Sequence, residues 1–236
     1  MSFSIYMFQS HLLLGLTSVL LGQCGVFAYF WLGKHFFFAT PIQTPPPYVF
    51  SEALVHHITR LEGLPLVGLY LVGTWTMGYL PVTYYSFVGG INWSHVALQL
   101  LIQDFGQYVV HRLQHKYLVH SHHPHHRFTH PKIFDAFDGS LSDTCLMILI
   151  PMTITCRLVP ANGWSYMVFG SIYANGLTLI HSEYAHPWDP LFRMIGFGTP
   201  ADHHMHHKTF RCNFGHLFMY WDRMFGTYQD GFQIKA

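Results

Sequence analysis

Residues 94–115 read SHVALQLLIQDFGQYVVHRLQH, a largely apolar stretch that ends in two spaced histidines. The stretch predicts a helix from about Ser94 to His115, long enough to cross a bilayer, which takes about 20 residues. Residues i and i+4 lie on one face of a helix, so His111 and His115 can bind a single metal ion. This stretch therefore predicts a membrane helix with a candidate metal site at its end.

The composition of the whole chain also favours a membrane protein. Half of the 236 residues are hydrophobic and only 10% are charged, against about 25% in ordinary soluble domains. The alternative is a soluble protein with a very hydrophobic core. The net charge of +1 and the lack of a basic face give no sign of nucleic-acid binding. Paired spacing is absent among Cys24, Cys145, Cys156 and Cys212, so we expect buried thiols and no disulfide framework.

Other apolar stretches predict the remaining membrane helices. The first expected span is 12–32, which is long and lacks the basic start of a signal peptide, the competing interpretation. A proline-rich loop follows, then a short interfacial helix over 51–62 and a second span over 64–85. Residues 144–159 and 164–180 are at the short limit for spanning, so they form either a full hairpin or one that dips into the membrane.

These elements predict an all-α membrane protein with four or five transmembrane or membrane-dipping helices and a cytosolic, histidine-rich cap. Residues 1–93 would form N-terminal membrane helices and a proline-rich loop, and residues 94–236 the histidine-rich part, within one continuous membrane domain. With the histidines in the cytosol, all of the 12 lysines and arginines except Arg157 fall on the cytosolic side. That distribution follows the positive-inside rule.

Histidine is concentrated in the second half of the chain: of 20 histidines, 15 lie from His111 to His216. After His111 and His115 come two H-x-x-H-H groups, whose i, i+3, i+4 spacing aims three imidazoles toward one side of a helical turn. The two groups, with one further candidate at the end of an apolar helix, are His122, His125 and His126; His203, His206 and His207; and His181. Each group alone could be a chance cluster or a surface cluster without a metal. Three groups on one side of a membrane predict metal binding.

The donor set narrows the choice of metal. Imidazole ligands exclude magnesium and calcium as natural occupants and suit zinc, iron and copper. A structural zinc site would use four ligands and favour cysteine. Nine candidate ligands exceed the needs of one ion, so we expect two metal ions. Two such ions beside a lipid-filled cavity suggest activation of dioxygen, for which iron is the usual metal.

Several motifs around these histidines resemble a known superfamily. They are DFGQYVVHR at 104–112, HHRFTHP at 125–131, HSEY at 181–184, H-x-x-H-H at 203–207, NFG at 213–215 and WDRMFGT at 221–227. In this order they resemble the fatty acid hydroxylase and sterol desaturase superfamily, integral membrane di-iron enzymes with histidine boxes. The similarity extends over residues 94–230, and the first 90 residues carry no motif.

The resemblance implies an enzyme with a catalytic cap. Its two iron ions would be bound by His111, His115, His122, His125, His126, His181, His203, His206 and His207. It would use O2 and electrons from NAD(P)H, delivered by a small membrane haem carrier and its reductase, to hydroxylate or desaturate a lipid. The long connection from His181 to His203 favours a sterol or related lipid. Family members suggest residence in the endoplasmic reticulum, with the boxes facing the cytosol.

The sequence leaves the roles of other polar residues open. A shifted register of the second group would use His120, His122 and His123. In the family register, the candidates for the surroundings of the ligands are Asp104, His120, His123, Glu183, Asp202 and His204. We expect the three carboxylates to accept the outer N–H of ligand imidazoles, although Asp104 could instead pair with an arginine or a polar group. His130, His186 and His216 would lie near the ligands or at the membrane interface.

Other functions are compatible with the sequence. Within the superfamily, these are hydroxylases of fatty acyl, sphingoid or alkylglycerol lipids. Outside it, the alternative is a non-catalytic membrane metal-binding protein, either a scaffold or a transporter. A transporter would place its ionisable ligands near the middle of the membrane, whereas most of these histidines lie beyond the ends of the predicted helices.

Overall fold

The computed structural model describes residues 12–25, 28, 32, 40–42, 50–59 and 63–233. Its α-helices are Leu12–Gly25, α2 (Phe50–Thr59), α3 (Gly63–Tyr70), α4 (Trp93–Tyr117), α5 (Val119–His126), α6 (Leu141–Thr144), α7 (Ile150–Leu158), α8 (Gly163–Leu179), α9 (Asp189–Met194), α10 (Pro200–Thr209) and α11 (Tyr220–Met224). The π-helical segments are η1 (Leu71–Thr76) and η4 (Cys145–Leu149), and the 3₁₀ segments are η2 (Val82–Tyr85), η3 (Ile133–Phe137) and η5 (Gly231–Gln233). Strands β1 (Thr40–Pro41) and β2 (Tyr184–Ala185) pair antiparallel. The prediction of a mostly helical protein is confirmed.

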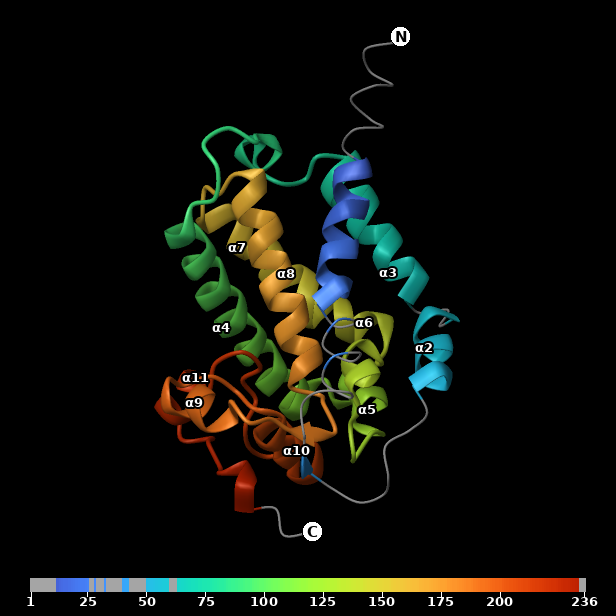
Figure 1. Ribbon diagram of the computed structural model, residues 1–236, viewed down its shortest axis with the longest axis vertical. Helices are drawn as coiled ribbons and strands as arrows, with labels where there is room; N and C mark the ends of the chain where they lie inside the picture. The colour runs from blue at the N-terminus through green and yellow to red at the C-terminus, as the bar shows by residue number, and fades with distance from the viewer. Residues whose placement is uncertain are drawn as a thin grey trace.

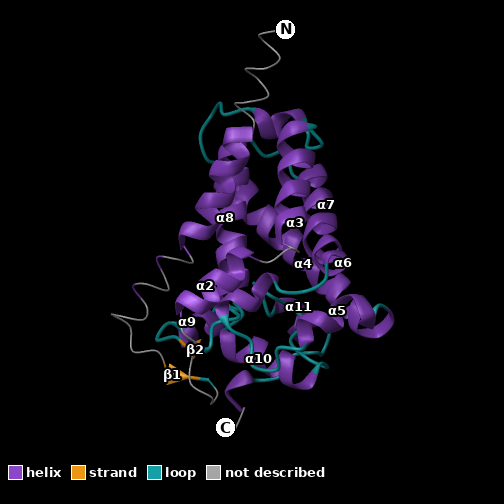
Figure 2. Ribbon diagram, turned by 90° about the vertical axis from the view of Figure 1, so that its right-hand side faces the viewer, coloured by secondary structure: helices purple, strands orange, loops and turns teal. Residues whose placement is uncertain are grey.

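The long helices form a bundle, and the short helices form a cap at one end of it. In Figure 1, α3, α4, α7, α8 and the helix Leu12–Gly25 run along the long axis, with α5, α9, α10 and α11 at the lower end. Figure 2 places β1 and β2 beside this cap. At the opposite end two loops meet, where Gly163 N–H donates to Ser86 O and Asn92 N–H donates to Ser165 Oγ. This arrangement puts all the short helices rich in histidine on one side.

Asparagine side chains define the starts of two bundle helices. Asn92 accepts a hydrogen bond from His95 N–H at the start of α4, and Asn162 accepts one from Ser165 N–H at the start of α8. Such caps satisfy backbone donors that have no partner within the helix. The helices predicted over 94–115 and 164–180 are confirmed by α4 and α8.

The expected number of membrane spans is only partly supported. Within the part of the chain that the structure describes, one helix is long and apolar enough to cross a membrane, Leu141–Leu158, with a mean hydropathy of 1.4. It runs continuously through α6, η4 and α7. The helix Leu12–Gly25 is apolar but shorter, and the rest of the first predicted span lies largely outside the described residues. Residues 60–62 of the predicted interfacial helix, the counterpart of α2, also lie outside them.

The second predicted span, over 64–85, is wrong in length. Helical structure begins at Gly63 but stops at Thr76, at the end of η1. The chain then turns at Gly78, which has a φ of 66°, a conformation that glycine adopts without steric cost. Pro81 follows with an extended ψ of 147° before η2. Gly78 and Pro81 therefore end this helix after four turns at most.

Helix α4 has a polar interior and an apolar exterior. Its inward face carries the fully buried Gln99, Gln103, Asp104 and Gln107, and continues to His111 and Gln114, against α7 and α8. Its outward face is apolar and exposed at Leu98, Leu101, Phe105, Val109 and Leu113. A helix at the surface of a water-soluble protein has the opposite distribution. Polar residues that face the bundle interior while apolar residues face outward are typical of a membrane helix.

The cysteines differ in exposure. Cys156 and Cys212 are buried thiols, as expected, whereas Cys24 is exposed. The expectation of burial was wrong for Cys24 because it lies on the outward face of the helix Leu12–Gly25.

Candidate metal centre

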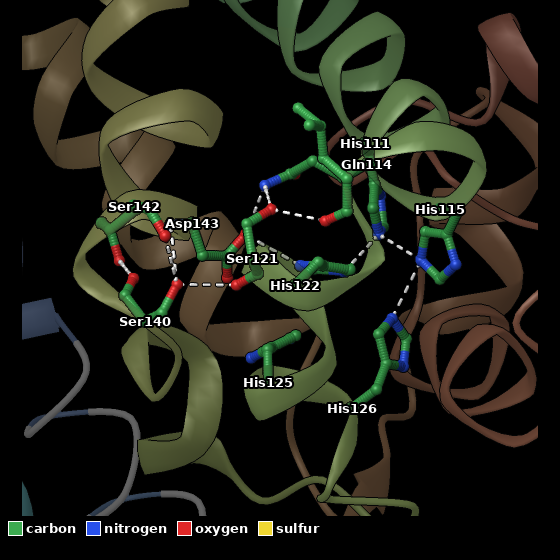
Figure 3. Close-up of polar contacts among 12 residues, drawn as sticks. His111, Gln114, His115, Ser121, His122, His125, His126, Ser140, Ser142 and Asp143 are labelled. Atoms are coloured by element: carbon green, nitrogen blue, oxygen red, sulfur yellow. Dashed lines mark hydrogen bonds and ion pairs between the residues drawn. The ribbon is translucent and has the colours of Figure 1, made fainter.

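The nine candidate histidines converge into two clusters at the cap end of the bundle. We call them cluster A, which is His111, His115, His122, His126 and His206, and cluster B, which is His125, His181, His203 and His207. Within each cluster, one ring nitrogen per residue lies within 4.8 Å of all the others. Figure 3 shows four members of cluster A, from α4 and α5, turned toward one another. Metal binding by these residues stays a prediction.

Helix geometry divides each H-x-x-H-H group between the clusters. From α5, His122 and His126 point into cluster A and His125 into cluster B. From α10, His206 joins cluster A, while His203 and His207 join cluster B. Residues at i and i+4 share a helix face, whereas the residue between them is rotated away. Each group therefore serves two sites, and the end of α8 adds His181 to the second.

The spacing between ring nitrogens fits a metal ion. Neighbouring Nε2 atoms lie 2.9–3.2 Å apart in cluster A and 2.9–3.3 Å apart in cluster B. Two imidazoles bound side by side to one ion, with metal–nitrogen distances of about 2.1 Å, place their nitrogens roughly 3 Å apart. A cation between these lone pairs would remove their mutual repulsion.

The outer nitrogens of most of these rings are hydrogen-bonded to the protein. Four Nδ1–H groups donate to backbone carbonyls over 2.7–3.0 Å: His111 to Phe214, His125 to Asp138, His181 to Leu177 and His206 to Cys212. Because a carbonyl oxygen only accepts, the proton is held on Nδ1. The Nε2 lone pair is then directed into the cluster, which is the tautomer that binds a metal.

Burial also keeps the imidazoles neutral. The pKa values of His203, His206 and His207 lie well below their ordinary value, mainly because the rings are buried and also because other imidazoles surround them. Near pH 7 these imidazoles are therefore neutral. Neutral imidazole is the form that can bind a metal ion.

The structure decides between the two registers of the second histidine group. His122, His125 and His126 are buried, at 3%, 6% and 6% exposure, whereas His120 and His123 are exposed. The shifted register is therefore wrong, because His120 and His123 lie on the outward face of α5. Both are surface residues, and His123 lines an open pocket beside His115, His122 and His126 of cluster A.

Four other histidines of the cap lie outside both clusters: His130, His186, His204 and His216. His204 is buried, but it is rotated away from its neighbour His203 along α10, and its Nε2 contacts Ser182 O at 3.0 Å. His130 is exposed. His186 contacts Asp189 at 3.3 Å. His216 differs, because it is buried beside the clusters, with its ring 4.9 Å from His111 and 5.3 Å from His203.

The carboxylates that were expected to contact ligand imidazoles have other roles. Asp104 accepts hydrogen bonds from Leu217 N–H, Phe218 N–H and Trp221 Nε1–H. Asp202 pairs with Arg193 at 2.6 Å and caps α10 through Thr199. Within residues 63–233, no cluster imidazole is hydrogen-bonded to Asp104, Asp202 or Glu183. The prediction for these three residues is wrong. Backbone donors of the C-terminal loop and the Trp221 indole hold Asp104, and Arg193 holds Asp202.

Asp222 stabilises the same C-terminal loop. Its carboxylate accepts hydrogen bonds from Phe214 N–H at 2.9 Å and Gly215 N–H at 2.7 Å. The loop that it holds presents the Phe214 carbonyl to His111.

The carboxylate that does contact a cluster imidazole is Asp143, which the sequence analysis missed. Its Oδ1 accepts hydrogen bonds from His122 Nδ1–H at 2.8 Å and Gln114 Nε2–H at 2.9 Å. Figure 3 shows Asp143 reaching from α6 toward His122 on α5. Ser140, which caps α6 by accepting from Asp143 N–H, marks a helix start in the sequence. That signal does not show which way the carboxylate points.

We expect Asp143→Ala to weaken metal binding by about 10- to 100-fold, since the partner that orients a ligand imidazole typically contributes this much. Asp143→Asn keeps an acceptor for His122 and should cause a smaller loss. Metal affinity by competition with a chelator measures both effects. The control is Ser142→Ala, whose hydroxyl contacts only Ser140 at the exposed surface. Wild-type affinity in Asp143→Ala would show that His122 needs no such partner.

Two adjoining cavities lie in the molecule, one among the bundle helices and one beside the clusters. The larger, of about 200 Å³, is mostly apolar and lies between the helix Leu12–Gly25, α3, α7 and α8. The smaller, of about 30 Å³, is lined by histidines of both clusters. Phe137, Ile148 and Leu177 line both cavities. An apolar molecule held in the larger cavity would therefore approach the clusters at these three residues.

Comparison with known proteins places the chain in a family. The Fatty acid hydroxylase family model matches residues 96–227. The chain is 48% identical, over 93% of its length and 66% of the relative's, to "Alternative squalene epoxidase" of Phaeodactylum tricornutum. It is 33% identical to "Cholesterol 25-hydroxylase" of Mus musculus, over 57% of the chain and 46% of the relative. It is 28% identical to a Delta(7)-sterol 5(6)-desaturase of Gibberella zeae, over 61% of the chain and 46% of the relative.

The chain thus spans between 46% and 66% of the length of these relatives. No solved structure shows significant similarity to it. The family match covers all nine clustered histidines and confirms the resemblance expected from the histidine boxes. The chain belongs to the fatty acid hydroxylase family.

Proposed function

We propose that this chain is a membrane-bound di-iron oxygenase that epoxidises a linear isoprenoid of the squalene class. The observation that carries the proposal is an apolar cavity that adjoins two clusters of metal-binding groups. The substrate class comes from the relative named as an alternative squalene epoxidase, which shares 48% identity over 93% of the chain. A hydrocarbon needs few polar contacts, and the larger cavity offers few.

Clusters A and B would each hold one iron ion. The bound iron would supply the redox chemistry that reduces dioxygen. In the overall reaction one oxygen atom enters the carbon–carbon double bond and the other leaves as water. This balance requires two electrons and two protons from outside the chain. We expect NAD(P)H to supply the electrons through a small haem carrier and its reductase. An all-imidazole donor set suits iron, and it would also accept zinc or copper.

The residues of the chain would position the substrate and exclude water. Phe137, Ile148 and Leu177 separate the apolar cavity from the cluster histidines. A double bond placed beside them would be held close to both clusters, and correct placement of reactants contributes several kcal/mol to catalysis. The apolar outer face of α4 supports a location in the membrane, where such a substrate dissolves. We propose four or five membrane-spanning or dipping helices, with the cap in the cytosol beside the endoplasmic reticulum membrane.

A sterol is the second candidate substrate. The sequence favoured it, and relatives with 25–33% identity are named as sterol hydroxylases, desaturases or a methylsterol monooxygenase. With a sterol, the same site would hydroxylate or desaturate a C–H position. The lower identity of these relatives makes this the weaker candidate.

Turnover in membranes tests the proposal. The chain would be expressed in a host that lacks its own squalene epoxidase, and its membranes supplied with squalene, NADPH and ¹⁸O₂. We expect the mono-epoxide of squalene with one ¹⁸O atom, detected by mass spectrometry. A sterol product instead would favour the second candidate. Iron-loaded protein without any oxidised lipid would support a non-catalytic metal-binding protein.

We expect a bulky residue at position 170 to obstruct the apolar cavity. Gly170 lines this cavity, and a Cβ added there meets no atom within 4 Å. Gly170→Phe should lower kcat/KM for a long lipid by about tenfold or more, because pocket shape controls substrate binding at this scale. Iron content should stay unchanged. Gly68→Phe is the matched control, since Gly68 also has open space but does not line the cavity. Equal kcat/KM in both variants would mean that the substrate binds elsewhere.

A further inference from the structure

The small cavity beside the clusters is lined by several polar residues. His122 and His125 on α5 and His181 after α8 belong to the clusters, and Asp143 is hydrogen-bonded to His122. Gln107 and His216 also line the cavity but belong to neither cluster. A volume of about 30 Å³ is enough for a molecule the size of water, but not for a lipid.

His216 lies between the clusters without joining either. It is only 5% exposed. Its ring centre lies 4.9 Å from that of His111 in cluster A and 5.3 Å from that of His203 in cluster B. These separations resemble those among the cluster rings themselves, such as 5.3 Å between His125 and His181. His216 is therefore close enough to both clusters to contact a small ligand held beside them.

Gln107 and His216 each have a buried polar atom with no partner among the described residues. These atoms are Gln107 Oε1 and His216 Nδ1. Gln107 lies one helical turn before His111 on α4 and is 2% exposed. A buried polar group without a hydrogen bond costs about 1–3 kcal/mol, and such groups in folded proteins usually have a functional or ligand-binding explanation. Both atoms belong to residues that line one cavity, so one ligand can satisfy both.

We propose that Gln107 and His216 bind a water or hydroxide ligand of the metal centre in this cavity, with the ligand donating to Gln107 Oε1 and accepting from His216 Nδ1–H. The inference rests on the proposed function. The ligand would lie between cluster histidines on one side and Phe137, Ile148 and Leu177 on the other, where the lipid arrives. Gln107 and His216 would orient it toward the lipid, and the nine cluster histidines would bind the metals without them.

Azide is a suitable probe, because it is a small anion that binds ferric iron where such an oxygen ligand binds. Its affinity for the oxidised, iron-loaded full chain can be titrated by its charge-transfer absorption. We expect His216→Phe and Gln107→Leu to retain wild-type iron content. His216→Phe should bind azide about tenfold more weakly, the loss typical of one hydrogen bond to a charged group. Gln107→Leu removes an acceptor oxygen, which cannot donate to the anion, so it should bind azide at least as tightly as the wild type. His216→Gln, which keeps a polar group, should recover part of the affinity.

His204→Phe is the matched control, since His204 is a buried histidine of the same cap that does not line this cavity. We expect it to bind azide like the wild type. Unchanged azide affinity in His216→Phe, or weaker azide binding in Gln107→Leu, would overturn the inference alone. Loss of iron from both His216→Phe and His216→Gln would also overturn it, because His216 would then be a metal ligand. A wild-type chain that takes up no iron would overturn the proposed function as well.

Discussion

Replacing His203 by alanine should empty cluster B and abolish turnover. The Nε2 of His203 lies 2.9 Å from that of His181 and 3.1 Å from that of His207, so it is central to that cluster. Without it, the two neighbouring imidazoles and His125 are left with a gap at the centre of their donor set. A catalytic metal contributes several kcal/mol to a reaction, so turnover should fall by at least about a thousandfold.

The measurement is iron per chain, together with product formation. We expect about half of the wild-type iron to remain in His203→Ala, held by cluster A. His206→Ala should show the reverse, with the iron of cluster B retained. His204→Ala is the control on the same helix and should keep both metals and turnover, because its imidazole contacts Ser182 O outside the clusters. Full iron content in His203→Ala would contradict the assignment of this residue as a ligand.

The second large effect is expected at Asp104, which connects α4 to the C-terminal loop. Its carboxylate is fully buried and accepts from two backbone N–H groups and from the indole of Trp221. Asp104→Ala leaves three buried donors without a partner, each costing about 1–3 kcal/mol, so the free energy of unfolding should fall by at least about 3 kcal/mol. His111 should lose its order too, because the same loop supplies the Phe214 carbonyl that orients it.

Thermal unfolding in detergent and limited proteolysis of residues 213–222 measure this effect. Asp104→Asn keeps an acceptor but loses the charge, so it should be destabilised less than Asp104→Ala. Asp230→Ala is the control: its carboxylate is half-exposed and pairs with Arg193 near the surface, where such pairs contribute about 0–1 kcal/mol. Equal melting temperatures for Asp104→Ala and Asp230→Ala would show that Asp104 does not stabilise the contact between α4 and the C-terminal loop.

The spacing of residues along the sequence predicted positions correctly where the residues share one helix. The i, i+3 and i+4 spacing selected eight histidines, and His181 was selected by its place at the end of an apolar helix. These are the nine that converge. The sequence pattern also located α4 and α8 to within a few residues. It failed at 64–85, where apolar composition continued beyond the helix while Gly78 and Pro81 turned the chain. The division of the chain at residue 93, like the metal ligation itself, stays a prediction.

Interactions between distant segments were not readable in this way. Asp104 seemed suited to a ligand imidazole because it lies two turns before His111 on one face, yet it binds a loop more than 100 residues later. Asp143 carried no signal, although it contacts His122. The sequence predicted a largely apolar helix over 94–115, and only packing against α7 and α8 showed that its polar residues face inward and its apolar residues outward.

The sequence by itself determined a largely helical protein, its family and which imidazoles converge. Helix geometry fixes the positions of side chains three and four residues apart. Only the tertiary structure decided how the histidines divide into two clusters, which carboxylate supports them, and that Gln107 and His216 adjoin them. Those relations join residues from separate helices, and they depend on how the helices pack, which no local pattern specifies.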